Sequence, residues 1–312
     1  MKLRIVCVSV VWGLAIFCFC YPQVEASEGA GVTSGITLIQ PVSARSAGRG
    51  EIGAANDGDI GLIQYNPAGL AFADQTQVGT MYQRGFDDDT LAYCAVGTPI
   101  GWGSVAGSVM YFGTGKIDMY DLNGNRIRKT GQQDIVVSMG TGMRLFDDRA
   151  GLGIMLKGIS SEIFGETATA FAVDTGFMVR NLIGSLDWGV SVLNLGTQLK
   201  YLETKEDLPA QVRTGVAYRM ALFQHEFIPY LEIPYLVHEQ ETLGLFGVEY
   251  VINRLIALRA GYKRNFDDAS RDDERDISLG IGFIWHQVSL DYAIGITDDL
   301  SNPHFVSLNA KF

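Results

Sequence analysis

Histidine, cysteine and carboxylate side chains are the groups in this sequence that could bind a metal ion or catalyse a reaction. None of the four histidines has a second ligand at the spacing that a zinc site requires; they are His225, His238, His286 and His304. The segment Asp121–Asn125 resembles a calcium-binding loop, but its twelfth position is Gln132 in place of a bidentate glutamate. We therefore predict no metal site and no cofactor.

Glycine and serine patterns suggest no catalytic site either. Gly151-Leu152-Gly153 lies inside a strand-like segment, whereas a nucleotide-binding loop needs a strand followed by a helix. No serine, histidine and acid arrangement can be assembled, so we expect no catalytic residue and no enzyme. The net charge is −11 and no basic patch is present, which argues against nucleic acid as a partner.

Two acidic clusters are the remaining candidate binding groups. One is Asp87-Asp88-Asp89, and the other comprises Asp267, Asp268, Asp272, Asp273, Glu274 and Asp276. Runs of like charge usually keep a loop solvated. The alternative is that divalent cations bridge these carboxylates to the phosphates of lipopolysaccharide, with outer-membrane lipid as the partner.

The segments that must position any site have the pattern of β-strands. From Thr76 onward, about fourteen segments of roughly ten residues each alternate apolar with small or polar residues, as tilted transmembrane strands do. Val288, Leu290 and Tyr292, for example, share one face, while Ser289 and Asp291 share the other. A soluble β-sandwich would also alternate in this way. The connections distinguish the two folds.

Short turns alternate with longer loops along the chain. The short set includes 98–101, 146–149 and 221–224, and the long set includes 113–132, 196–208 and 265–275. This alternation matches the periplasmic and extracellular ends of bacterial barrels. The last residue, Phe312, ends an apolar face and resembles the signal that barrel-assembly machinery reads. We predict an all-β, single-chain transmembrane antiparallel β-barrel of about fourteen strands over residues 76–312.

The N-terminus has the pattern of a secretory signal peptide. Lys2 and Arg4 precede an apolar run that is short for a membrane-spanning helix of about 20 residues, and Val24-Glu25-Ala26 offers a cleavage site. We predict a signal peptide over residues 1–26, which leaves Cys94 as the single cysteine of the mature chain and allows no internal disulfide.

Residues 27–75 do not alternate and are rich in glycine and alanine. Within them, Asn66 can cap a helix, Pro67 fits the first helical position and Gly69 allows a sharp exit. A compact segment of this kind suits a plug inside a barrel, but it would equally suit a turn packed on any sheet.

A family resemblance favours the plug. Ser43–Gly48, Ala54–Asp57 and Tyr65–Ala71 together resemble the N-terminal segment of the PorV/PorQ family, which belongs to the FadL-like group of outer-membrane barrels. Arg49 and Glu51 stand where that family has methionine and glycine, and Gly58 interrupts its acidic pair. The resemblance implies an N-terminal hatch in the lumen, with its central element formed by Asn66, Pro67, Ala68, Gly69 and Leu70.

The resemblance also implies two candidate functions. The first is that hydrophobic, fatty-acid-like small molecules pass around the hatch and across the outer membrane of a Gram-negative bacterium. The alternative is a PorV/PorQ-type partner of a type IX secretion system, which binds an exported protein. Long ordered extracellular loops would favour the alternative, and only 113–132 and 196–208 are sizeable here.

Overall fold

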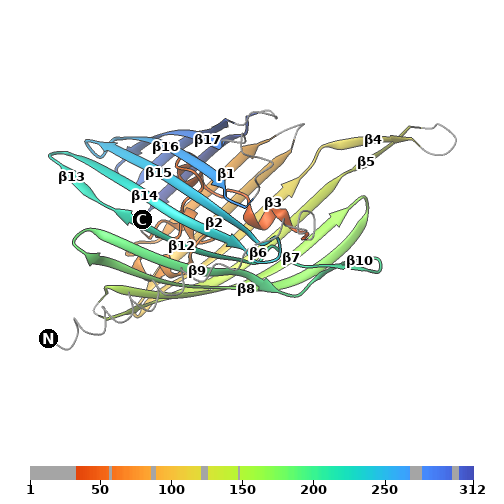
Figure 1. The fold of residues 1–312 in the computed structure, drawn as a ribbon, viewed down its shortest axis with the longest axis horizontal. Coiled ribbons are helices and arrows are strands. Elements are labelled where there is room, and N and C mark those ends of the chain that lie inside the picture. Colours follow the sequence, from red (N-terminus) through yellow and green to blue (C-terminus); the bar gives the residue numbers. More distant parts are fainter. Residues whose placement is uncertain are drawn as a thin grey trace.

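Fourteen antiparallel strand positions close into a barrel (Figure 1). The structure is a computed structural model and describes residues 33–55, 58–85, 89–120, 126–146, 148–267, 276–296 and 302–312. Each strand pairs with the next along the barrel, and the last pairs with the first. The strands are β1 (Gln77–Arg84), β2 (Thr90–Ile100), β3 (Gly103–Gly113), β6 (Gln132–Leu145), β7 (Ala150–Ile163), β8 (Glu166–Ile183), β9 (Leu186–Gly196), β12 (Gln211–Tyr218), β14 (His225–Leu236), β15 (Glu241–Ile252), β16 (Ile256–Asn265), β17 (Asp276–Trp285), β18 (Val288–Ile296) and β19 (His304–Lys311).

The barrel predicted from the alternating pattern is confirmed, with two differences in detail. β8 has 18 residues, which is well beyond the roughly ten residues expected of each segment. One strand of the barrel is interrupted, because β12 and β13 (Met220–Leu222) pair separately with successive parts of β14. β12 and β13 therefore occupy one position in the barrel.

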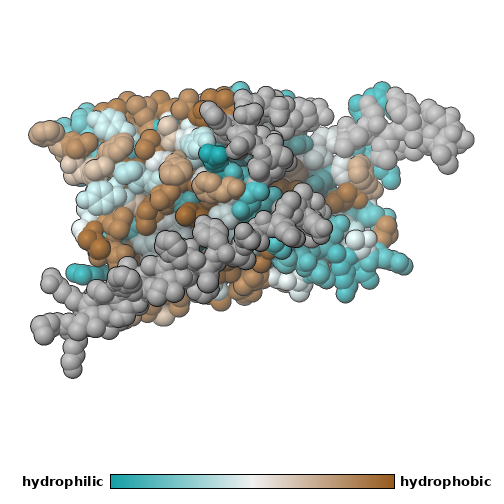
Figure 2. Space-filling model, viewed as in Figure 1, coloured by the Kyte–Doolittle hydropathy of each residue, from teal (hydrophilic) through white to brown (hydrophobic). Residues whose placement is uncertain are grey.

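Side-chain type follows the two faces of the wall. In β7, Leu152, Ile154 and Leu156 point outward and are exposed, whereas Gly153 and Met155 point inward and are buried. Figure 2 shows apolar residues spread over much of the barrel surface. Hydrophilic residues gather at the lower right of the view, over β10 and the neighbouring ends of β7 and β8. No helix in the described part of the chain is both long and apolar enough to cross a membrane.

The two ends of the barrel differ, and we call them the turn end and the loop end. Strands are joined at the turn end by tight turns such as Phe223-Gln224 and His286-Gln287, where Phe223 and His286 have positive φ, as two-residue hairpin turns require. The loop end carries two further hairpins, β4–β5 (Lys116–Tyr120 and Arg126–Thr130) and β10–β11 (Leu199–Tyr201 and Thr204–Glu206). The β4–β5 hairpin projects beyond the barrel (Figure 1).

Large apolar side chains are exposed at every turn-end connection and at the C-terminus. We call this set the turn-end rim: Trp102, Phe146, Ile183, Phe223, Leu255, Trp285 and Phe312. Turns that face water are usually polar, so this ring indicates that the turn end borders an apolar or interfacial environment.

Candidate functional site

The lumen is filled by residues 33–55 and 58–76, which we call the hatch. It contains η1 (Ile36–Ile39), α2 (Ala44–Ala47), η2 (Ile60–Leu62) and η3 (Pro67–Phe72). Helices this short are unstable alone, so their packing against the wall must hold them. Thr33 pairs with Asp207 at the loop end, and Thr76 accepts a hydrogen bond from the nitrogen of Phe312 at the turn end. The hatch therefore threads the barrel from one end to the other.

The predicted element, Asn66 to Leu70, lies at the centre of the hatch and is buried throughout. Asn66 caps η3, because its side-chain oxygen accepts from the nitrogen of Ala68 at 3.0 Å, and Pro67 occupies the first turn. The Asn66 amide also donates to the carbonyl of Ala54 at 2.6 Å, which ties two parts of the hatch together. The expected exit at Gly69 is wrong: the 3-10 helix continues through it and ends at Phe72, with Ala73 as its C-cap.

Five wall glycines receive η3 and the loop before it; they are Gly142, Gly151, Gly153, Gly176 and Gly189. A Cβ atom at Gly153 would lie 2.2 Å from the carbonyl carbon of Pro67 and 2.4 Å from the nitrogen of Ala68. We call these five residues the glycine seat. Because hatch atoms lie directly on them, these inward glycines hold the hatch and do not line an open apolar path.

The opposite wall holds the hatch through buried charges. Arg45 donates to both oxygens of Glu249 at 3.0 and 3.1 Å and to Asp59 at 3.1 Å. Arg259 donates one hydrogen bond to Glu249 at 2.8 Å and another to Asp291 at 2.7 Å, and so links the two carboxylates. The Glu249, Arg259 and Asp291 side chains are at most 3% exposed. Full pairing makes such a cluster tolerable inside a protein, and removing one member leaves a buried charge.

A second ionic contact fixes the loop between α2 and η2. Glu232 accepts from the backbone nitrogens of Gly53 and Ala54 at 2.8 and 2.7 Å and from Arg213 at 2.6 Å. The Arg213 guanidinium stacks on Tyr65, 5.0 Å from the ring centre.

These ionic residues were not predicted from the sequence, although a signal for them existed. Glu232, Glu249, Arg259 and Asp291 occupy inward positions of otherwise apolar and small strands. A charge at an inward position of a barrel strand must find a partner in the lumen. The sequence does not show which partner, because Arg45 lies 204 residues before Glu249.

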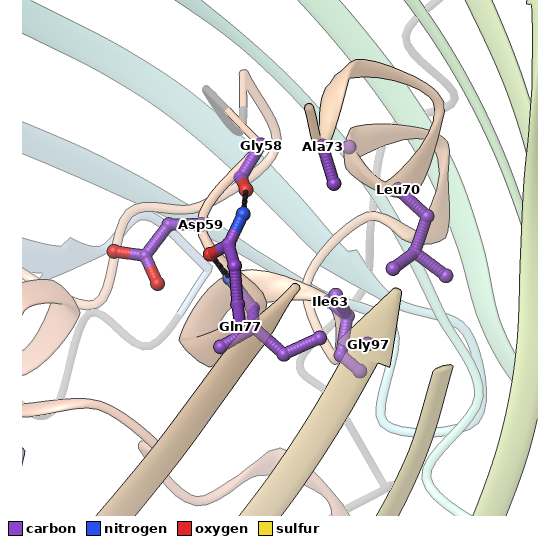
Figure 3. Close-up of a pocket in the computed structure, with 9 residues that line it drawn as sticks. Gly58, Asp59, Ile63, Leu70, Ala73, Gln77 and Gly97 are labelled. Carbon is purple, nitrogen blue, oxygen red and sulfur yellow. Dashed lines mark hydrogen bonds between the residues drawn. The ribbon is translucent and has the colours of Figure 1, made fainter. Parts of the chain in front are cut away.

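The hatch is sealed at the turn end by Gln77, the first residue of β1 (Figure 3). Its amide donates to the carbonyl of Gly58 at 2.8 Å, and its oxygen accepts from the nitrogen of Ile60 at 3.2 Å. The space between Gln77, Ile63 and Leu70 is too small for a water molecule. No water-filled gap therefore separates these hatch and wall residues.

Replacing Gln77 with alanine should loosen this seal. The change removes two buried hydrogen bonds and leaves the Ile60 nitrogen without its acceptor, so we expect a loss of about 1–3 kcal/mol in the free energy of unfolding. Urea unfolding of the purified barrel measures it. Gln83→Ala on the same strand is the control, because its side-chain oxygen has no hydrogen-bond partner in the described residues. Equal losses in the two variants would contradict the proposed seal.

The other candidate groups, where the structure describes them, make ordinary contacts with neighbouring residues. His225 stacks on Tyr250, and His304 is hydrogen-bonded to Tyr292 at 2.7 Å. Asp267 accepts from the nitrogen of Thr242 and so holds two loop-end connections together. Most of the acidic clusters and all of Asp121–Asn125 lie outside the described residues. Within the described residues, no group of three or more His, Cys, Asp or Glu side chains could hold a metal ion.

Comparison with solved structures identifies the architecture. The toluene transporter TbuX of Ralstonia pickettii superposes with a TM-score of 0.65 at 11% identity, covering 88% of this chain and 99% of that one. The fold is FadL-like. The Pseudomonas putida toluene transporter TodX covers 93% of this chain and 98% of its own, with a TM-score of 0.58 at 12% identity. A FadL homologue of Pseudomonas aeruginosa gives a TM-score of 0.58 at 12% identity over 91% of this chain and 99% of its own.

No protein-family model and no curated protein sequence matches the chain. At identities of 11–12%, the FadL-like likeness concerns the fold alone. The finer resemblance to the PorV/PorQ family stays a hypothesis.

Proposed function

We propose that this protein is a FadL-like outer-membrane channel that passes hydrophobic small molecules around its hatch. The observation that carries the proposal is a closed barrel with an apolar outer face and an N-terminal segment threaded through its lumen. A plain structural barrel would need no such segment, and a water-filled pore would be open. Solved barrels of the same fold include two described as toluene transporters, which supports an apolar cargo.

Membrane insertion follows from the outward face and the turn-end rim. Outward residues along the strands are mainly large and apolar, and aromatic residues on barrels gather where lipid chains meet headgroups. We place the turn-end rim at that boundary on the periplasmic side and the loop end outside the cell. The signal peptide over residues 1–26, the recognition of Phe312 by assembly machinery and cation-bridged lipopolysaccharide contacts belong to the same proposal.

Tryptophan quenching should report this placement. Trp102 and Trp285 lie on the rim, whereas Trp188 is half-buried in β9 and is hydrogen-bonded to Thr214. In a Trp188→Phe variant, we expect lipids brominated just below the headgroup to quench fluorescence more strongly than lipids brominated at the chain ends. Quenching by aqueous iodide alone would contradict the placement.

Uptake of an apolar tracer tests the proposed transport. Cells that lack their own hydrocarbon channels would express the wild-type chain or a chain without residues 43–71, and accumulation of labelled toluene would be measured. We expect the wild type to accelerate toluene accumulation relative to empty cells. The deletion should change this rate, and the rate should no longer saturate as the toluene concentration rises. A folded wild-type barrel that leaves accumulation at the level of empty cells would overturn the proposal.

A second candidate function is docking of an exported protein, as in type IX secretion. Both sizeable loops contain hairpins, and β4–β5 extends away from the barrel, as a docking element would (Figure 1). Mass spectrometry of the barrel extracted natively in mild detergent separates the two candidates. A retained apolar molecule supports transport, whereas a stoichiometric exported protein with an empty lumen supports docking.

A further inference from the structure

A polar pocket lies between two neighbouring connections at the turn end. One connection, Phe223-Gln224, joins β13 to β14, and the other, Asn253-Arg254, joins β15 to β16. The pocket has a volume of about 370 Å³, within the usual range of about 300–1,000 Å³ for small-molecule sites. In Figure 1, β13 lies at the end of the barrel opposite the β4–β5 hairpin. The pocket is therefore a feature of the turn end of the wall.

Opposite charges line this pocket without pairing to each other. Glu226 of β14 and Arg254 of the β15–β16 turn both line it, and no ion pair joins them. Among the described residues, neither side chain has a hydrogen-bond or ion-pair partner, and the same holds for the amides of Gln224 and Asn253. Two unpaired charges of opposite sign around one space suit a ligand that carries both an anionic and a cationic group.

Apolar side chains surround these charges. Phe223 lines the pocket and is fully exposed, and Leu222 and Leu255, which adjoin the two connections, are also exposed. Charged tips that face only water need no such residues, whereas a charged pocket with apolar flanks suits the level at which lipid chains meet headgroups. We placed the turn-end rim, to which Phe223 and Leu255 belong, at that level.

The β13 strand gives the pocket a reason to be occupied. Its three residues pair with β14, and no other described strand pairs with them. The ladder between β9 and β12 already ends where Leu186 lies opposite Tyr218. A short strand that is paired on one side opens readily. A ligand bound to both Glu226 and Arg254 would hold the β13–β14 tip against the next turn.

One wall of the pocket is already fixed. The His225 ring lines it and stacks on Tyr250 of β15, with the ring centres 5.7 Å apart. This contact holds the start of β14 against β15. The β14 side of the pocket is therefore preformed, and the ligand has to immobilise only the two turns and their long side chains.

We propose that this pocket binds the headgroup of a membrane phospholipid that carries a phosphate and a primary ammonium, as phosphatidylethanolamine does. The phosphate accepts hydrogen bonds from the Arg254 guanidinium, and the ammonium donates to the Glu226 carboxylate. The acyl chains lie beside Phe223 and Leu255 of the turn-end rim. This inference goes beyond transport and rests only on the placement of the rim at the periplasmic lipid boundary.

Other common headgroups satisfy only part of the pocket. Phosphatidylglycerol supplies the phosphate but no cation, so Glu226 would remain unpaired. Phosphatidylcholine supplies a cation without an N–H group, so it cannot donate a hydrogen bond to Glu226 or to the amide oxygens of Gln224 and Asn253. The pocket should therefore select phosphatidylethanolamine over both.

Native mass spectrometry of the full chain in a mild detergent measures this selectivity. The purified barrel is mixed with equal amounts of the dioleoyl forms of the three lipids, and the bound fraction of each is compared. We expect the wild type to retain phosphatidylethanolamine over each of the others by roughly tenfold. Glu226→Gln should abolish the preference over phosphatidylglycerol, and Arg254→Gln should lower phosphatidylethanolamine retention to the level of phosphatidylcholine.

Matched controls lie on another turn-end connection. Asp148 and Arg149 are exposed there, so Asp148→Asn and Arg149→Gln remove the same two charges outside the pocket. Both should bind the three lipids as the wild type does. The heat-dependent gel mobility of each variant shows that its barrel is folded.

Hydrogen exchange locates the bound headgroup. In nanodiscs that contain phosphatidylethanolamine, the amides of β13 should exchange severalfold more slowly than in nanodiscs of phosphatidylcholine alone, while those of Asp148 and Arg149 should not change. Phosphorylethanolamine, the soluble headgroup, should give no such protection to the barrel in phosphatidylcholine nanodiscs, because it lacks the chains that the rim contacts. Protection by the soluble headgroup would overturn the assignment to a lipid.

The outcomes separate this inference from the proposed function. Equal retention of the three lipids by the wild type, or an equal loss of preference in Asp148→Asn, would overturn the site. If the wild type still accelerated toluene accumulation, the transport proposal would stand without it. If no apolar tracer crossed, the transport proposal would fail, and a preference lost in Glu226→Gln and kept in Asp148→Asn would still support the site.

Discussion

A Gly153→Ala variant should conduct ions across a planar bilayer, whereas the wild type should remain closed. The added Cβ atom would lie 2.2 Å from the Pro67 carbonyl carbon and 2.4 Å from the Ala68 nitrogen, and neither backbone atom can rotate away. Overpacking a well-packed interior usually costs about 1–3 kcal/mol. Here the least costly response is for η3 to leave the glycine seat, because the wall is held by complete strand ladders on both sides.

A matched control lies on the same strand. Gly158 points outward, and a Cβ atom there would meet only the edge of the Phe171 ring at 3.9 Å. Gly158→Ala should therefore stay closed and unfold at the wild-type urea concentration. If Gly153→Ala behaved like Gly158→Ala in both measurements, η3 would not be seated on β7.

Glu249→Gln should destabilise the protein strongly. The neutral side chain leaves Arg45, Arg49 and Arg259 with fewer negative partners inside the barrel. Breaking a buried ion pair by removing one partner costs about 3–5 kcal/mol, and we expect a loss of that size in the free energy of unfolding. A urea titration, in which the folded fraction is monitored by the heat-dependent gel mobility of the barrel, measures this loss.

Two further variants show whether charge causes the loss. Glu226→Gln, a half-exposed position on neighbouring β14, should change the free energy of unfolding by no more than about 0.5 kcal/mol. Adding Arg49→Met to Glu249→Gln should restore part of the stability, because the remaining charges can pair as Arg45 with Asp59 and Arg259 with Asp291. The electrostatic account would be contradicted if the double variant lost more free energy of unfolding than Glu249→Gln and Arg49→Met lose together as single changes.

The barrel could be predicted from the sequence because its signal is local. Each strand carries its own alternation of two residues, and each connection shows its own length, so neither requires knowledge of the rest of the chain. The sequence predicts long loops over 113–132 and 196–208, where the structure has the β4–β5 and β10–β11 hairpins. The strands of β10–β11 have three residues each, which is too few for alternation to be recognised.

The site could be predicted only where it is local in sequence. Asn66 and Pro67 cap and begin η3 as their neighbours suggested, but Gly69 carries no exit because packing on β6–β8 continues the helix. The hydrogen bonds from the hatch to the buried wall carboxylates join residues far apart in sequence: Gly53 lies 179 residues before Glu232, and Arg45 lies 204 residues before Glu249. The glycine seat could not be predicted for the same reason: nothing near these glycines in sequence shows that the hatch covers them.

The path of the hatch through the lumen constrains the order in which the barrel can assemble. Ala44 donates to Ser307 of β19 across 263 residues, and Thr33 reaches Glu239 across 206. Contacts this distant form late, since a long chain must first be brought together. A segment anchored at both ends of a closed cylinder is also hard to insert afterwards. We infer that the hatch already lies inside the open barrel before closure and that the pairing of β1 with β19 forms last. This pairing encloses a segment that is synthesised before either strand.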